Sequence, residues 1–199
     1  MGIDPTKVMV GLPDQSSTTG AILRGPVLKN IPADITAALT AVSGYDDCGY
    51  VSEDGANLTT EISTVDVREW GGAIVRRLLE SFTGTIGATM IQADYDGWCH
   101  ALGEENVTKI PASSSHGEQL HIKIGANLTE PQCWALLMKD GDARMVVLVP
   151  NGQVTGGIEL TFAGNEVVKL PLEISCNDDG TGDGTSIHIY TDDGQKTSA

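Results

Sequence analysis

Turn-forming residues interrupt this chain so often that its regular elements must be short. The sequence of 199 residues contains 24 glycines and 8 prolines, and Val, Ile and Thr are frequent between them. Glycine and proline end regular elements, whereas β-branched residues favour strands. This pattern predicts a mainly β fold: an antiparallel β-sandwich or barrel with one main flanking α-helix and extended arms.

Periodicity and turn residues locate the expected strands. From Phe82 to Met90, apolar or small residues at even positions alternate with threonine and glycine, which is the period of a half-buried strand. The turn Glu53-Asp54-Gly55 is expected to join residues 48–52 and 57–67 into a hairpin. Further turns are expected at Asp140-Gly141 and Pro150-Asn151-Gly152. The other strands are expected at residues 21–25, 119–125, 132–139, 143–149, 158–162, 166–176 and 186–191.

Two segments have the spacing of short helices. Residues 94–102 are expected to form the main helix, with Asp94 as the N-cap and Gly103 as the C-terminal stop. Residues 32–42 place apolar side chains on one face and predict a second, shorter helix. We expect the main helix to pack on a sheet.

The chain is long enough to bury a core without disulfides or metals. Residues 1–20 show little apolar periodicity and predict an extended N-terminal arm. The β domain is expected to span residues 21–191, and residues 192–199 are expected to form a flexible C-terminal tail.

The charge of the chain argues against nucleic-acid binding. There are 27 acidic and 12 basic residues, which gives a net charge of −15. The basic residues are scattered, and only Arg76 and Arg77 are adjacent. Tight phosphate binding depends on clustered Lys and Arg, so we exclude it. The acidity serves either solubility or a surface that does not retain passing polyanions.

No constellation in the sequence predicts an enzyme. Residues 178–184 resemble a calcium loop, but Thr181 and Tyr190 stand where acidic ligands are needed, so we predict an acidic turn. Ser113-Ser114-Ser115-His116 lacks a nucleophile elbow and predicts a polar loop. We therefore expect no catalytic residue, no metal ligand and no cofactor. Four widely spaced cysteines are expected to be buried free thiols: Cys48, Cys99, Cys133 and Cys176.

The N-terminal residues lack the basic stretch and apolar run of a secretory signal. No window approaches the roughly 18 apolar residues of a membrane span. We therefore expect a protein that is made and stays in a cytoplasm, with no membrane contact.

Two blocks of sequence carry a resemblance to a known family. The first contains Gly49-Tyr50-Val51-Ser52-Glu53-Asp54-Gly55, then residues 64–72 (TVDVREWGG) and Ile74-Val75-Arg76. The second contains Asn106-Val107-Thr108 and then Pro150-Asn151-Gly152-Gln153-Val154. In order and spacing, over residues 45 to 175, these blocks resemble the major tail tube proteins of long-tailed, siphovirus-type bacteriophages.

The resemblance implies a structural virion protein, made in the cytoplasm of the host bacterium, that polymerises as stacked hexameric rings. The resulting tail tube would carry DNA into the host without binding it. The implied partners are further copies of the chain, the tape measure protein, and tail terminator and initiator proteins. The segment from about 58 to 73 would be a long loop that reaches the next ring. Its implied contact residues are Leu58, Val65, Val67, Arg68 and Trp70.

Other readings of the same sequence remain open at this point. One is another virion β module, such as a head-tail connector component or a capsid decoration protein. A second is a carbohydrate-binding β-sandwich, which would need exposed aromatic residues on one face, and the aromatic content is only 5%. Trp70, beside Gly71-Gly72, is expected to be the most exposed tryptophan.

Overall fold

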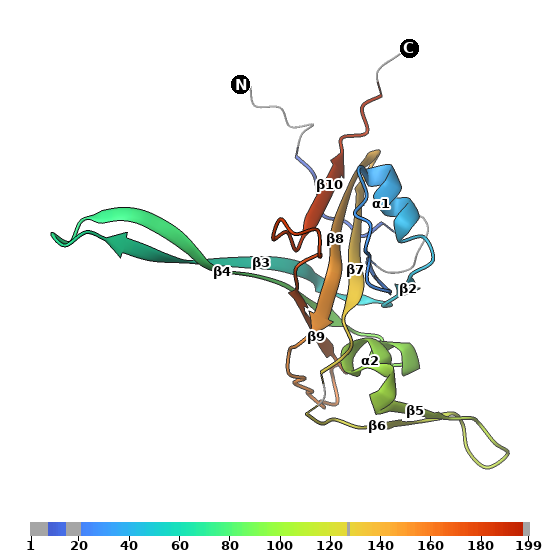
Figure 1. The fold of residues 1–199 in the computed structure, drawn as a ribbon. Coiled ribbons are helices and arrows are strands. Elements are labelled where there is room, and N and C mark those ends of the chain that lie inside the picture. Colours follow the sequence, from blue (N-terminus) through green and yellow to red (C-terminus); the bar gives the residue numbers. More distant parts are fainter. Residues whose placement is uncertain (1–7, 15–20, 127, 197–199) are drawn as a thin grey trace.

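The computed structural model describes residues 8–14, 21–126 and 128–196, and it confirms the predicted mainly β, antiparallel fold. Figure 1 shows a β body from which one long two-stranded hairpin projects. The main sheet has eight strands in the order β2-β1-β7-β8-β9-β4-β3, with β10 paired to β8 beside that path. A separate small hairpin joins β5 and β6. The strands of the main sheet are β1 Ile22–Gly25, β2 Asp46–Asp47, β3 Val51–Arg68, β4 Ile74–Met90, β7 Gln132–Asp140, β8 Ala143–Val154, β9 Leu170–Cys176 and β10 His188–Asp192.

Strands β7 and β8 are central because they bury side chains on both faces. Successive residues of a strand point to opposite faces. Trp134 and Leu136 therefore belong to one core cluster, whereas Cys133 and Ala135, the residues next to them, belong to another. Near-continuous apolar runs such as 133–137 are what a strand covered on both faces requires.

Each face of the sheet is covered by a helix. Helix α1 (Ile35–Ala41) contacts β8 and β10 and contributes Ala38 to the smaller core cluster. Helix α2 (Tyr95–Leu102) contacts β5 and β9 and contributes Trp98 to the larger one. Its N-cap is Asp94, whose side chain accepts a hydrogen bond from the Gly97 amide at 2.9 Å, as expected. Gly103, with φ +88°, ends the helix as predicted.

A short 3-10 helix, η2 (Glu104–Asn106), leads from α2 into the small hairpin. This hairpin pairs β5 (Val107–Ile110) with β6 (Gln119–Ile122), and its strands are joined by residues 111–118. Lys109 Nζ lies 3.0 Å from Glu118 Oε2 across it. The Ser113–His116 segment lies in this exposed connection, as the polar-loop prediction required.

The turn predicted at Glu53-Asp54-Gly55 is wrong. Strand β3 runs through these residues, and the pairing with β4 shifts register between Val51 and Ala56. Gly55 has φ +69°, so its positive φ serves an irregularity within a strand instead of a hairpin turn. The hairpin turn lies at residues 69–73, and β3 and β4 form one long ribbon.

The turn predicted at Pro150-Asn151-Gly152 is also wrong, because these residues lie inside β8. The β7–β8 register shifts between Gln132 and Trp134, opposite this segment. A bulge is one of the few places where a strand tolerates proline. Beyond it, β8 stops pairing with β10 and pairs with β9 through Gly152–Val154.

The strand predicted at residues 158–162 does not form, and the strand predicted at 166–176 begins only at Leu170. Ile158 and Leu160 still pack against the larger core cluster. The alternation of apolar residues therefore indicated the inward side of Ile158 and Leu160 but not of Phe162, which is exposed, and the backbone of this segment has no strand partner.

Part of the predicted N-terminal arm lies within the described residues. Pro13 forms a bridge with Met138 of β7, and the Asp14 amide donates to the Leu137 carbonyl at 3.0 Å. The Lys139 amide donates to the Leu12 carbonyl at 2.8 Å. Residues 8–14 are therefore held against β7, whereas 1–7 and 15–20 lie outside the described residues, as do 197–199 of the predicted C-terminal tail.

The four cysteines are free and buried, as predicted. Burial raises the pKa of the Cys48 thiol to about 12, so it stays protonated near neutral pH. Among the described residues, no helix is long and apolar enough to cross a membrane.

Candidate assembly surface

The dominant surface feature is the part of the β3–β4 ribbon that leaves the body. Strand β4 pairs with β9 from Gly84 to Met90, and beyond Gly84 it pairs only with β3. We call residues 61–83 the hairpin arm. All of its residues are exposed except Asp66, which is partly buried. The segment predicted as a loop is thus a two-stranded ribbon, held together by its own backbone pairing.

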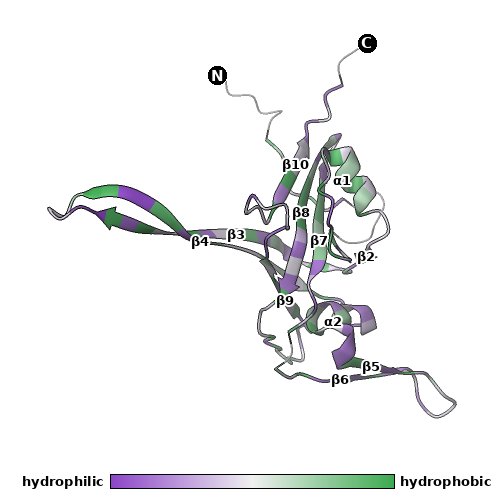
Figure 2. Ribbon diagram, viewed as in Figure 1, coloured by the Kyte–Doolittle hydropathy of each residue, from purple (hydrophilic) through white to green (hydrophobic). Residues whose placement is uncertain are grey.

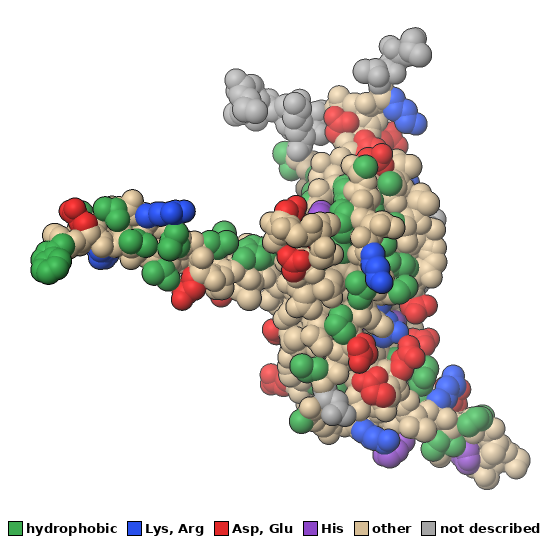
Figure 3. Space-filling view, in the orientation of Figure 1, with side chains coloured by type: hydrophobic (Ala, Val, Ile, Leu, Met, Phe, Trp, Pro, Cys, Tyr) green, Lys and Arg blue, Asp and Glu red, His purple; other side chains and the backbone are tan. Residues whose placement is uncertain are grey.

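The arm exposes many large apolar side chains to solvent. Figure 2 shows hydrophobic residues along both strands of the ribbon, and Figure 3 shows hydrophobic side chains along the arm and at its tip. An isolated two-stranded hairpin is at best marginally stable in water. Contiguous exposed apolar surface usually marks an interaction site. The exposed set comprises Ile62, Val65, Val67, Trp70, Ile74, Val75, Leu78, Leu79 and Phe82.

The predicted contact residues do not share one face of this ribbon. Val65 and Val67 alternate with Asp66 and Arg68 along β3, so the two valines lie on one face and the charged pair on the other. Leu58 lies on the body side of the arm, where its partner Ile86 also pairs with β9. The structure therefore brings Val65 and Val67 together and separates Leu58 from them.

Trp70 occupies the tip, and its relative exposure of 106% confirms the prediction that it is the most exposed tryptophan. Trp98 and Trp134 are buried in the core. A tight turn presents Trp70: the Gly72 amide donates to the Glu69 carbonyl, and the Glu69 amide donates to the Ala73 carbonyl, both at 2.9 Å. Gly72 has φ +90°, which other residues rarely adopt.

The distal arm has the opposite charge balance from the rest of the chain. Residues 64–79 contain three arginines against Asp66 and Glu69, a net charge of +1 in a chain of −15. Asp66 lies between two of the arginines, 3.0 Å from Arg77 Nε and 3.6 Å from Arg68 Nη2. Among the described residues, Arg76 forms no ion pair.

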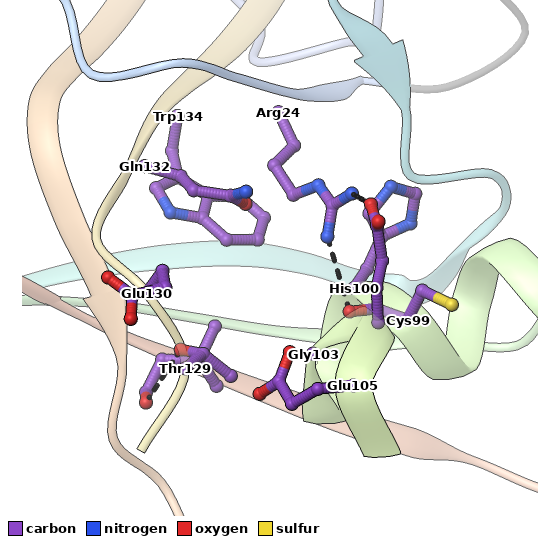
Figure 4. Close-up of a pocket in the computed structure, with 11 residues that line it drawn as sticks. Arg24, Cys99, His100, Gly103, Glu105, Thr129, Glu130, Gln132 and Trp134 are labelled. Atoms are coloured by element: carbon purple, nitrogen blue, oxygen red, sulfur yellow. Dashed lines mark hydrogen bonds and ion pairs between the residues drawn. The ribbon is translucent and has the colours of Figure 1, made fainter. Parts of the chain in front are cut away.

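A polar pocket of about 190 Å³ lies between β1, α2 and the start of β7. Figure 4 shows Arg24 reaching from β1 toward α2. Arg24 is buried, donates to the Cys99 carbonyl at 3.2 Å and pairs with Glu104 at 3.1 Å. These contacts provide partners for the buried Arg24 guanidinium near the C-terminal end of α2. They therefore connect α2 to β1.

His100 lines the same pocket and is 3% exposed. Burial, together with the positive charge of Arg24, lowers the pKa of His100 to about 4. Its Nδ1 has no hydrogen-bond partner among the described residues. No group of three or more His, Cys, Asp or Glu among the described residues could hold a metal ion.

The acidic segment 178–184 folds as a polar turn that contacts β10 through His188. Asp179 Oδ1 accepts hydrogen bonds from the Thr181 amide and hydroxyl, and Asp179 Oδ2 lies 2.8 Å from His188 Nε2. Asp183 accepts a hydrogen bond from the Thr185 amide at 3.0 Å. The carboxylates are thus engaged by neighbouring side chains and amides of the turn.

Comparison with known families decides the class of protein. A family model described as phage tail tube protein matches residues 1–197, nearly the whole chain. The chain belongs to the phage tail tube protein family. No curated protein matches it. As a tail tube protein it is a structural component of a bacteriophage virion, and the family implies self-assembly into a tube.

The sequence reasoning missed much of the exposed surface of this tail tube protein. The implied contacts stopped at residue 73, yet Ile74, Val75, Leu78 and Leu79 expose apolar side chains on the second strand of the arm. The signal was present in the sequence, because residues 74–79 are rich in Ile, Val and Leu. They precede the half-buried strand period of residues 82–90, so no place on the surface was predicted for them.

Proposed function

We propose that the chain polymerises as stacked hexameric rings into the tail tube of a siphovirus-type phage and that this tube is the conduit for DNA ejection. Tape measure, initiator and terminator proteins would be its other partners. The hairpin arm would contact the next ring, with Val65, Val67, Arg68 and Trp70 in the contact and Leu58 at its base.

One observation carries this proposal: the hairpin arm, which extends from the body with apolar side chains exposed on both strands. In a monomer, an unpaired edge of this kind invites uncontrolled association. In a closed ring and a stacked tube, neighbouring copies would cover it. The family match also supports assembly into a tube, because the subunits of a tube need contacts that repeat along its axis.

The charge of the chain supports the DNA conduit. With 27 acidic against 12 basic residues, a lumen of average composition would repel a polyanion. DNA could then pass without being retained, since binding requires clustered Lys and Arg.

The test is negative-stain electron microscopy of the purified protein, concentrated across a series of salt concentrations. We expect hollow filaments with a regular axial repeat and six copies per ring in the reconstruction. A matched control replaces residues 64–80 by Asn-Gly, which shortens the arm and should leave rings or monomers but no filaments. Closed particles from the full chain would instead support a decoration protein, and solid filaments would contradict the conduit.

A further inference from the structure

The body contains a cavity with a mainly apolar lining. Its volume is about 380 Å³, and it lies between the N-terminal segment, β1, the root of β3 and β7. Apolar cavities of about 150 Å³ already bind benzene, so this one has room for the two rings of an indole. The apolar lining includes Leu12, Pro13, Ile22, Val51, Leu136 and Met138.

The wall of this cavity favours an aromatic occupant. Met138 lines it, and thioether sulfur makes favourable contacts with aromatic rings. The cavity therefore fits a large aromatic side chain.

The chain offers such a side chain at the tip of the hairpin arm. Trp70 is fully exposed, although tryptophan is usually buried in a core or an interface. It cannot enter the cavity of its own chain. The fifteen residues from Ala56 to Trp70 are almost all extended strand, which separates the tip from the root by on the order of 40 Å.

The charges around the two sites are complementary. Arg76, near the tip, forms no ion pair among the described residues. Glu53 lines the cavity and Asp54 is exposed beside it, and neither forms an ion pair within the described residues. Complementary charges of this kind set the orientation and rate of docking.

We propose that Trp70 of one copy inserts into the cavity beside Ser52 of a second copy, with Arg76 facing Glu53 at the rim. This proposal deepens the proposed function, because it names the contact through which copies associate. The contact joins the tip of one arm to the root of the next, so it is heterologous. Such a contact repeats from copy to copy without closing on itself as a dimer does.

Disulfide trapping tests the contact directly. Two single variants, Gly71→Cys and Tyr50→Cys, are mixed at high concentration and oxidised. Gly71 is next to Trp70 and has room for a side chain, and Tyr50 lines the cavity and is exposed. The native cysteines are buried, so their background is low. We expect a covalent dimer in this mixture at least about tenfold above a control mixture of Gly71→Cys with Ser114→Cys, which places the second thiol in the exposed β5–β6 connection. Equal trapping in the two mixtures would overturn the docking site.

Tryptophan fluorescence gives a second readout that does not depend on new thiols. Trp98 and Trp134 are buried in the monomer, so a blue shift on assembly would report burial of Trp70. Trp70→Ala should raise the concentration needed for filaments at least about tenfold, and Trp70→Phe less, because the Phe ring still fills part of the cavity. Normal filament growth by Trp70→Ala would overturn the docking site and leave the tube intact. Absence of filaments from the unmodified protein would instead count against the tube, while trapping in the mixed variants would still report the contact.

The rim charges are tested by exchange. Arg76→Glu alone should weaken association, and the double variant Arg76→Glu with Glu53→Arg should restore it, because the attraction is then re-formed between copies. The association of the double variant is compared with the value expected from adding the effects of the two single variants. If the double variant associates no better than this sum, the proposed orientation is contradicted.

Discussion

At the scale of single residues, His100 makes the stability of the body depend on pH. The pKa of His100 is about 4 in the folded chain, because burial and Arg24 disfavour its protonation, against 6.5 in the unfolded chain. Between these values only the unfolded chain takes up the proton, so folding stability falls as the pH decreases from 6.5 to 4. We expect a loss of about 3 kcal/mol across this window, measured by urea denaturation.

The matched variant for this prediction is His100→Gln, which keeps a polar side chain but cannot titrate. Its free energy of unfolding should be nearly constant from pH 6.5 to 4.5. Asp46, Asp94 and Asp96 act in the opposite direction, because their negative charges favour protonation of His100. An equal slope in the two proteins would mean that other groups cause the pH dependence.

The N-cap of α2 gives a second prediction for a single residue. Asp94 Oδ1 accepts from the Gly97 amide at 2.9 Å, which satisfies one of the free donors at the start of the helix. Asp94→Ala should lower the stability by about 1 kcal/mol, whereas Asp94→Asn, which can also cap, should lose much less. Thermal unfolding followed by circular dichroism would compare them, and equal losses would show that the cap contributes nothing.

At the scale of elements, the hairpin arm should be dispensable for folding. Residues 64–80 bury no core side chain, and Ser63 lies opposite Ser81, so Asn-Gly can close the ribbon there as a two-residue turn. The shortened protein should unfold within about 4 °C of the full chain. The check is a thermal melt by circular dichroism under conditions where both proteins are monomeric. A much lower melting midpoint of the shortened protein would show that the arm contributes to the stability of the body.

The errors of the sequence prediction are also explained at this scale. Asp54-Gly55 and Asn151-Gly152 carry the residues of a hairpin turn, yet both lie at register shifts inside long strands. Gly55 has the positive φ that turns and bulges both use, whereas Gly152 has no positive φ and leaves room for Trp134, whose Cδ1 would lie 2.7 Å from an added Cβ. Only the pairing of distant strands distinguishes a turn from a bulge. The caps of α2 were predictable because they depend on local residues, Asp94 and Gly103.

Only part of the candidate surface could be predicted, because local residues can be read from the sequence and the pairing of distant strands cannot. The exposure of Trp70 followed from its neighbours Gly71 and Gly72, which indicate a turn tip. The separation of Leu58 from Val65 and Val67 could not be predicted from the local sequence, since it depends on where β9 stops pairing with β4. The cavity beside Ser52 combines four segments of the chain, so no local pattern could have indicated it.

At the scale of the whole molecule, charge should control assembly through two opposing effects of salt. Each copy carries a net charge of −15, so copies repel one another at low ionic strength. Salt screens this repulsion, with a Debye length of about 10 Å at 0.1 M. It also weakens any pair between Arg76 and Glu53, but an exposed pair contributes only about 0.2 to 1 kcal/mol.

The repulsion of many charges should outweigh a few exposed pairs, so filaments should form at lower protein concentration as NaCl increases from about 0.02 M to about 0.3 M. Light scattering at a fixed protein concentration would follow this, with KCl at equal ionic strength as the control for ion-specific effects. Apolar burial of Trp70 is not screened, so the high-salt filaments should persist. Filaments that dissolve as salt is added would show instead that ionic contacts hold the copies together, and the apolar surface of the arm would then lose its role as the main adhesive.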